Sequence, residues 1–417
     1  MKVLRQQRIG IKGVVDWRRL VKIFWGLLNG LWAIPLVVVF RLLQPLVLFR
    51  FGTIRSDRIG HFVTDSAEQK ARLQVRDGKR LDFYWLPTRT ANQQWLRMIQ
   101  REMPVINCTR HIDDWNRRLP GGERHSRPST YSESRDKEGL YYRYDCGFDF
   151  TVEEDRMCRS WLSSIGWSDG ELVVCVLVRD SIYLAEDQIT TRYDKVSKDR
   201  WSYHDYRDSN IFNYLPALTW LADQGVWVFR MGKLMEKPLN AGHPRIIDYA
   251  FSTRRSDLLD VWLFANCSFC ISTSTGPDSI ATVYRRPILY LNASPLGHLT
   301  TYSNSLWVPK NLFWIDDDSP LRLKDYLTHT YFHSQKYHDA GLRFQELTQE
   351  EIVEFVQEFW DRQHQTWQSS EEDLTLQHKF WGVLRGWDGY QNWHGWCHPN
   401  AGVATSWLRR QRKDFFD

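Results

Sequence analysis

Between residues 171 and 292 the sequence alternates short apolar segments with helix-like segments, and this alternation limits the fold more than any other feature. The apolar segments include VVCVLV, VWVF, SFCIS and PILYLN, and the segments between them include NYLPALTWLADQG and SDLLDVWLFANC. Strands that are apolar on both faces are typical of a parallel sheet that helices cover on both sides. The alternation therefore predicts a doubly wound α/β domain.

A similar alternation occurs nearer the N-terminus. PLVLFRFGT and KRLDFYWLP have the pattern of strands, and FVTDSAEQKARLQV, ANQQWLRMIQREM and EEDRMCRSWLSSIGW have the pattern of helices. Residues 109–147 are polar and rich in turn residues, so we expect an irregular excursion there. We therefore expect two Rossmann-like domains, 46–170 and 171–330, that face each other across a cleft.

Residues 331–417 are expected to form a helical extension. QEEIVEFVQEFWDRQHQTW has apolar residues on one helical face, and the tail FWGVLRGWDGYQNWHGWC is crowded with tryptophan. Tryptophan in such a tail indicates either a core or a surface that contacts sugars or a membrane interface. We expect the extension to pack back on the first domain.

The N-terminus is basic and then apolar. Residues 1–22 hold seven Lys or Arg and the single acid Asp16, so they carry a net charge of +6. The whole chain carries +5, so the remaining residues together carry −1. A basic leader on a neutral body argues against a nucleic-acid-binding protein and favours an anionic membrane surface as partner. Residues 23–40 carry no charge, and at about 1.5 Å per residue they would barely cross a bilayer core.

We expect residues 1–45 to associate with the membrane by lying at the interface, on the cytoplasmic face of the plasma membrane. A single spanning helix, a buried helix and a cleaved signal peptide are the alternatives. A span would export residues 50–417. Seven scattered cysteines, an odd number, show no disulfide framework and suit a reducing compartment. The Cys267 and Cys270 pair falls in an expected strand and is interpreted as buried thiols.

Polar side chains follow several of the expected strands. Arg179 and Asp180 follow one strand, Arg230 and Gly232 follow another, and a Ser/Thr loop with Gly276 follows a third. In parallel α/β sheets, ligands bind beyond the carboxyl ends of the strands, where hydroxyls and arginines are suited to a phosphate or diphosphate without a metal. Ordinary turns, helix caps and surface ion pairs are the alternative interpretation of these residues.

A second candidate site follows the first expected strand, in the segment RSDRIGHF. There Arg58, Gly60 and His61 lie at the mouth of that strand, and Asp65 comes one turn later. Histidine of ordinary pKa can deprotonate an alcohol, and the aspartate can do so or orient the histidine. A structural histidine is the alternative.

Some classes of site are not supported by the sequence. The dinucleotide motif G-x-G-x-x-G and the phosphate loop G-x-x-x-x-G-K-[ST] do not occur. Asp316, Asp317 and Asp318 precede Ser319 and Pro320, where acids cap a helix, so a metal site is the less favoured interpretation. We expect no metal and no cofactor.

The segments RIGHF, VRDSIYL, YRDSNIFNYLPALTWLADQGVWVFRMG, IIDYAFSTRRSDLLDVWLFANCSFCISTSTGPDSIA and RRPILYLN together resemble a family of bacterial glycosyltransferases found with surface-polysaccharide and O-antigen genes. The resemblance covers about residues 50–300 and does not include the apolar leader. It implies a GT-B fold, with the acceptor in the first domain and a nucleotide-sugar donor in the second. His61 or Asp65 would be the catalytic base, and Arg58 and Gly60 would lie on the acceptor side. The implied donor-binding residues are Arg179, Asp180, Arg207, Asp208, Asn210, Arg230, Gly232, Asp248, Ser272, Thr273, Ser274, Thr275, Gly276, Asp278 and Ser279.

The resulting hypothesis is a metal-independent transferase that moves a sugar from a nucleotide-sugar to a hydroxyl of a lipid-linked surface glycan. Two alternatives remain open: a scaffold that binds glycans without turnover, and a sugar epimerase or donor hydrolase of similar fold. The sequence names no donor, acceptor or linkage.

Overall fold

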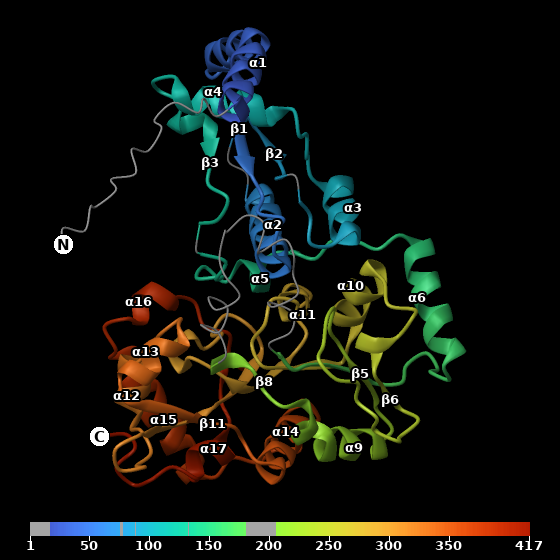
Figure 1. Ribbon diagram of the computed structural model, residues 1–417, viewed down its shortest axis with the longest axis vertical. Helices are drawn as coiled ribbons and strands as arrows, with labels where there is room; N and C mark the ends of the chain where they lie inside the picture. Colours follow the sequence, from blue (N-terminus) through green and yellow to red (C-terminus); the bar gives the residue numbers. More distant parts are fainter. Residues whose placement is uncertain (1–16, 76–77, 88, 132, 181–205) are drawn as a thin grey trace, which may run out of the picture. The chain divides into compact units, whose positions relative to one another are not determined.

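The computed structural model describes residues 17–75, 78–87, 89–131, 133–180 and 206–417, which form two compact units (Figure 1). Unit 1 comprises Met1–Ile54, Arg76–Leu86 and Met103–Ser129, and Unit 2 comprises Arg55–Val75, Pro87–Glu102 and Thr130–Asp417. The basic residues Lys2, Arg5, Arg8 and Lys12, and the side chains of Arg18, Arg19 and Lys22, lie outside what is described. The predicted domains with a boundary at residue 170 stay a prediction.

Unit 1 is built on a parallel sheet of order β2-β1-β3. Its strands are β1 (Leu48–Thr53), β2 (Arg80–Trp85) and β3 (Ser126–Arg127), and its α-helices are α1 (Trp17–Leu42) and α4 (Thr109–Arg118). Buried Ala33 and Val37 of α1, Phe51 of β1 and Ile112 of α4 form its core. The irregular excursion predicted for residues 109–147 is therefore wrong over its first part, where α4 forms. α4 buries the polar Asp113 and Asn116 as well as Ile112, so its sequence has little apolar periodicity.

A buried carboxylate joins the three strands of Unit 1. Asp82 of β2 receives Nε and Nη2 of Arg50 on β1 at 2.6 and 2.8 Å, and Nη1 of Arg127 on β3 at 2.6 Å. Arg127 reaches Asp82 past Gly52, where an added Cβ would lie 2.8 Å from the Cβ of Arg127. Glycine at this position of β1 thus makes room for the ion cluster.

Unit 2 contains a seven-stranded parallel sheet of order β12-β9-β8-β7-β4-β5-β6. Its strands are β4 (Val173–Leu177), β5 (Trp227–Arg230), β6 (Ile246–Ile247), β7 (Phe269–Ser272), β8 (Ile288–Ala293), β9 (Ser305–Pro309) and β12 (Gly402–Val403). The six strands from β6 to β9 follow the Rossmann order 3-2-1-4-5-6. The doubly wound sheet predicted for this part of the chain is therefore confirmed.

Helices cover both faces of this sheet. Figure 1 shows α10 (Asp257–Asn266) and α11 (Asp278–Val283) on one face, and α9 (Leu215–Asp223) and α14 (Gln349–Gln363) on the other. α11 packs on β7 and on α2 (Ile59–Gln74), and α10 packs on α3 (Gln93–Glu102) and α6 (Val152–Ser164). Because both faces are covered, all the residues of β4, β5, β7 and β8 are buried.

The last part of Unit 2 is mostly helical but also contains strands. Its α-helices are α12 (Leu323–Thr328), α13 (Ser334–Asp339), α14, α15 (Glu371–Arg385), α16 (Tyr390–Trp393) and α17 (Thr405–Arg409), and β10 (Asn311–Trp314) pairs antiparallel with β11 (Leu342–Gln345). The short α5 (Leu140–Arg143) lies earlier in the unit. All seven cysteines are free thiols, and five of them, including Cys267 and Cys270, are buried.

Candidate functional site

The candidate site lies where the strand order of the large sheet changes direction. β5 pairs with one edge of β4, and β7, which comes later in the chain, pairs with the other edge of β4. Loops that leave the carboxyl ends of two such strands run in opposite directions and leave a crevice for a ligand. Arg179 follows β4, and the loop Thr273–Pro277 follows β7, so both come from the strands that form this switch point.

Cationic side chains gather beside the end of β4. Nε of Arg179 donates to Oδ1 of Asp208 at 2.9 Å, Nζ of Lys310 donates to the carbonyl oxygen of Asp208, and Nη2 of Arg207 donates to the carbonyl oxygen of Ser274. Burial, followed by the charge of Arg207, lowers the pKa of Arg179, and burial lowers the pKa of Lys310. Within the described chain, no carboxylate oxygen lies within 4.0 Å of the side-chain nitrogens of Arg207 or Lys310.

A cation that is removed from water and has no carboxylate partner, such as the buried Lys310, is costly unless an anion joins it. The Nε atom of Arg207 is buried without a hydrogen-bond partner in the described structure. These cations therefore have unused capacity for a negatively charged ligand, which they would bind through charge-assisted hydrogen bonds.

The Ser/Thr loop after β7 is held by its own hydrogen bonds. Oγ of Ser272 donates to Oδ2 of Asp278 at 2.6 Å, and the same oxygen accepts the backbone N–H of Thr275 at 2.8 Å. Oγ1 of Thr273 accepts the backbone N–H of Arg179 at 3.0 Å, which ties the loop to the end of β4. Ser274 adopts the left-handed conformation at φ 61°. These contacts fix the loop, and the hydroxyls of Ser272 and Thr273 serve its own structure.

Asp278 is the acid at the centre of that loop. Burial raises its pKa to about 6, against the opposing effects of Ser272, the Thr275 N–H and the charge of Arg207. A carboxyl with such a pKa is still mostly ionised at neutral pH. Its interaction with Arg207 therefore partly offsets the positive charge of the cations beside β4.

A second group of polar residues meets at the loop after β8, where Arg135 contacts His298 and Leu299. The guanidinium of Arg135 donates to the carbonyl oxygens of Trp393, His298 and Leu299 at 2.6, 3.2 and 2.7 Å. Burial, followed by the charges of Arg135 and Arg207, lowers the pKa of His298 to about 2. The Nε2 atom of His298 is buried without a described partner. The positive charges of Arg135 and Arg207 thus both lower the pKa of His298.

The remaining predicted donor residues are engaged elsewhere. Arg230 donates to the carbonyl oxygen of Lys237 at 2.6 Å and pairs with Asp248 at 3.3 Å, and Asp248 also accepts the N–H of Leu239. Asp180 accepts the N–H of Glu236 at 2.9 Å. These contacts hold the loop after β5.

Asn210 and Gly232 also have structural contacts. Oδ1 of Asn210 caps a short helix by accepting the N–H of Phe212 at 3.1 Å, and Gly232 lies against Met235. The residues between Asp180 and Tyr206, which include most of the segment VRDSIYL, lie outside the described residues.

The candidate base belongs to the same unit. His61 lies in the first turn of α2, and its Nδ1 is 2.7 Å from Oγ of Ser134. Burial, followed by the charges of Arg55 and Arg58, lowers the pKa of His61 to about 4. Asp65 is fully buried and receives Nε of Arg55 at 2.7 Å and Oγ of Ser134 at 2.8 Å.

Two glycines bring the start of α2 against the Ser/Thr loop. A Cβ added at Gly60 would lie 3.1 Å from Cα of Gly276, and one added at Gly276 would lie 3.2 Å from the backbone nitrogen of Gly60. The two backbones therefore approach more closely than side chains would permit. The predicted base and the predicted phosphate loop are neighbours within Unit 2.

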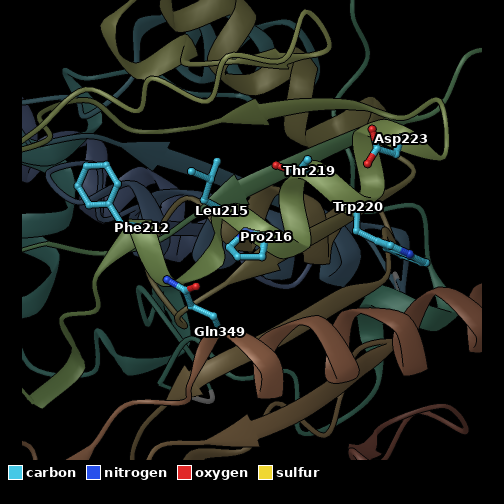
Figure 2. Close-up of a pocket in the computed structure, with 7 residues that line it drawn as sticks. All are labelled: Phe212, Leu215, Pro216, Thr219, Trp220, Asp223 and Gln349. Carbon is cyan, nitrogen blue, oxygen red and sulfur yellow. The ribbon is translucent and has the colours of Figure 1, made fainter.

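One hollow of about 470 Å³ lies apart from these residues (Figure 2). Phe212, Pro216 and Trp220 line it together with polar side chains such as Asp223 and Gln349. Figure 2 shows Phe212 and Trp220 at opposite ends of the lining residues. None of the predicted site residues lines it.

Three residues of the site were missed by the sequence interpretation. Ser134, Arg135 and Lys310 contact Asp65, His298 and Asp208, which lie 69, 163 and 102 residues away in the chain. Lys310 directly follows β9, so a correct prediction of that strand would have placed this lysine at the carboxyl edge of the sheet. No local signal marks Ser134 or Arg135.

No protein-family model matches the sequence, and no curated protein matches it. Solved structures that the chain resembles include the glycosyl transferase family 9 protein of Veillonella parvula DSM 2008, at 10% identity over 74% of this chain and 95% of that one, with a TM-score of 0.43. E. coli ADP-heptose LPS heptosyltransferase II matches at 11% identity over 75% of this chain and 100% of that one, with a TM-score of 0.38. E. coli heptosyltransferase WaaC with ADP matches at 10% identity over 76% and 100%, with a TM-score of 0.35. Likeness at this level carries no inference about the function of this chain.

Proposed function

We propose that this protein is a metal-independent glycosyltransferase that moves a sugar from a nucleotide-sugar donor to a hydroxyl of a lipid-linked surface glycan. The observation that carries the proposal is the group of cations at the strand switch point, in the same unit as a histidine that could act as a base. Arg179, Arg207 and Lys310 would neutralise the diphosphate that leaves the donor sugar. His61 would accept the proton of the acceptor hydroxyl.

The charge balance supports a diphosphate rather than a neutral ligand. Three cations, Arg179, Arg207 and Lys310, lie near two carboxylates, Asp208 and the mostly ionised Asp278. The Nε atom of Arg207 has no hydrogen-bond partner within the described part of the chain. A diphosphate carries enough negative charge to satisfy the excess, and leaving-group stabilisation by fixed cations needs no metal. Among the described residues, no group of three or more His, Cys, Asp or Glu side chains is arranged to hold a metal ion.

Replacing Arg207 with glutamine is expected to weaken binding of the nucleoside diphosphate about 10- to 100-fold, because it removes charge-assisted hydrogen bonds. The measurement is titration calorimetry with UDP, GDP, ADP, CDP and dTDP, after a thermal-shift screen. Arg156→Gln is the matched control, since Arg156 is an exposed arginine of α6 in the same unit. The proposal fails if no nucleotide or nucleotide-sugar of a broad panel stabilises the protein when membrane lipid is present. Donor turnover without acceptor would instead identify an epimerase or hydrolase.

We further propose that α1 attaches Unit 1 to the cytoplasmic face of the plasma membrane without crossing it. The segment Phe24–Leu42 is long enough and apolar enough to span a membrane, judged by length and composition alone. Buried Ala33 and Val37 pack toward α4, whereas Leu31 and Leu42 are 75% and 74% exposed. The exposed face of α1 is apolar: Phe24, Trp25, Leu27, Leu28, Leu31, Trp32, Leu36, Val38, Val39 and Leu42.

The packing of α1 on α4 supports an in-plane helix over a span. Nη2 of Arg41 bonds the carbonyl oxygens of Asn116 and Leu119, and Gly30 lies against the ring of Trp115. α4 carries Arg110, Asp113, Asp114, Arg117 and Arg118. If α1 crossed the bilayer with its packing intact, these charges would enter hydrocarbon at a cost of about 2.5 to 3.5 kcal/mol for each Arg or Asp.

The double variant Leu31→Glu, Leu42→Glu is expected to lose binding to vesicles of phosphatidylethanolamine and phosphatidylglycerol, because it places two carboxylates on the inserted face. Leu374→Glu is the control, since Leu374 is 62% exposed on α15 of Unit 2. Wild-type protein should stay bound in high salt, which screens charges but not apolar contacts. Unchanged binding of the double variant would contradict the proposal. Digestion of the protein body by protease added outside intact spheroplasts would instead support the spanning alternative.

A further inference from the structure

Ser134 is the centre of a four-residue polar cluster. Its hydroxyl oxygen lies 2.7 Å from Nδ1 of His61, 2.8 Å from Oδ1 of Asp65 and 2.9 Å from Nη2 of Arg55. Arg55 also donates to both carboxylate oxygens of Asp65, at 2.7 and 3.3 Å. His61 and Asp65 are therefore linked through the Ser134 hydroxyl.

The number of protons in this cluster determines the tautomer of His61. A hydroxyl has one hydrogen to donate and two lone pairs to accept with. Arg55 can only donate, and the Asp65 carboxylate, bonded by two N–H groups of Arg55, can only accept. The single hydrogen of Ser134 therefore goes to Asp65, and its lone pairs accept from Arg55 and from His61. Nδ1 of His61 must carry the hydrogen, which leaves the lone pair on Nε2.

The charges around His61 support a neutral ring at physiological pH. Arg55 and Arg58 face it as cations, and Asp57 and Glu133 face it as acids. Burial and the two arginines dominate and lower its pKa to about 4. A neutral imidazole carries a single N–H hydrogen, so if Nδ1 carries it, Nε2 has none.

The turn that carries Ser134 is held in an unusual conformation. Glu133 and Ser134 both adopt left-handed backbone angles, at φ 51° and 63°, which cost about 1 to 2 kcal/mol each in a residue other than glycine. The N–H of Ser134 donates to Oγ1 of Thr130 at 3.0 Å and fixes the turn. Strain of this kind persists where surrounding contacts require it, and it clusters at functional sites.

We infer that Ser134 is a positioning residue that holds His61 as the Nδ1–H tautomer, so that Nε2 is the atom that takes the proton of the acceptor hydroxyl. This inference rests on the proposed function. In the transfer step the acceptor oxygen forms a bond to the anomeric carbon, and its proton moves to Nε2. The bond from that carbon to the phosphate oxygen breaks, and the diphosphate leaves with the electron pair. The resulting imidazolium keeps its Nδ1–H bond to Ser134, whose own hydrogen is bonded to the Asp65 carboxylate.

The inference also decides between the two candidate bases. Both oxygens of Asp65 are already occupied by Arg55 and Ser134, and the residue has no exposed surface. His61 is partly exposed and is bonded through Nδ1. Asp65 therefore acts through Ser134 and does not meet the acceptor itself.

The test is ¹⁵N NMR of histidine-labelled full-length protein, with His61→Gln used to assign the signal. Wild-type His61 is expected to be the Nδ1–H tautomer, and Ser134→Ala is expected to shift it toward the Nε2–H form. Ser134→Gly removes the same hydroxyl but suits the left-handed turn, so it separates the loss of the hydroxyl from the effect of strain. Glu133→Asn changes the same turn and keeps the hydroxyl, and it should leave the tautomer unchanged.

Activity gives the second readout. Both Ser134 variants should lower kcat about 10- to 100-fold, part of the contribution of a general base, with donor affinity unchanged. If wild-type His61 is the Nε2–H form, or if neither Ser134 variant moves the tautomer, the inference is wrong even when the protein transfers sugar. If the tautomer behaves as expected but no transfer is found, the proposed function fails and the positioning role of Ser134 stands.

Discussion

Replacing His61 with alanine is expected to lower kcat about 10²- to 10⁴-fold, the usual contribution of a general base, while donor affinity stays nearly unchanged. The ring is partly exposed at the start of α2, so its loss should leave the fold intact. The measurement is transfer to a lipid-linked acceptor, with donor binding followed separately by calorimetry. His378→Ala, an exposed histidine of α15, is the matched control. A kcat equal to that of the wild type would exclude His61 as the base.

The pH dependence of kcat/KM should identify the same group. The pKa of His61 is lowered to about 4, and a base acts only when it is deprotonated. A lowered pKa keeps the ring deprotonated further into acid, so activity that depends on His61 should persist well below the ordinary histidine pKa of about 6.5. The acidic limb near pH 4 should disappear in the residual activity of His61→Ala. A limb near pH 6.5 that His61→Ala leaves in place would point to another base.

Replacing Asp82 with alanine is expected to destabilise Unit 1 by about 3 to 5 kcal/mol, because the change leaves two arginines without the buried carboxylate that both contact. Asp82 and Arg127 are almost completely buried, with 1% and 2% of their side chains exposed. Urea unfolding of the full chain, with hydrogen exchange of peptides from β1 and β2, should show the loss in Unit 1.

The exposed pair Arg110 and Asp114 on α4 provides the control for this experiment. Its atoms are 3.8 Å apart, and about half of each side chain is exposed. Surface pairs of this kind contribute about 0 to 1 kcal/mol. Asp114→Ala should therefore have a small effect, and an equally small effect of Asp82→Ala would show that the cluster does not hold the sheet together.

Much of the large sheet was predictable because its strands are apolar on both faces. Segments such as VVCVLV and PILYLN are typical of a covered parallel sheet, and they form β4 and β8. α4 was not predictable in the same way, because its buried side presents Asp113 and Asn116 to polar partners. β12 was missed because a strand of two residues carries no periodicity.

The site was predictable only where it follows the strands. The placement of Arg179 and the Ser/Thr loop follows from their positions after β4 and β7, whatever ligand they meet. The partner of His61 did not follow from any pattern, since Ser134 lies 73 residues away in a turn with an uncommon backbone conformation. Arg230 also appears at a strand end, but its contacts with Lys237 and Asp248 became clear only from the folded chain. Sequence position identifies the edge of a sheet, and the tertiary contacts decide which side chains there are free to act.

The packing of α1 affects how the protein should be produced for these experiments. Apolar N-terminal segments are often deleted to obtain material that dissolves without detergent. Here the deletion of residues 1–45 would remove Ala33 and Val37 from the core that they share with Phe51 and Ile112. It would also remove Arg41, which bonds the end of α4 at Asn116 and Leu119. Newly bared apolar surface on β1 and α4 would promote aggregation in place of membrane binding. The intact chain in detergent or nanodiscs is therefore the preferable sample.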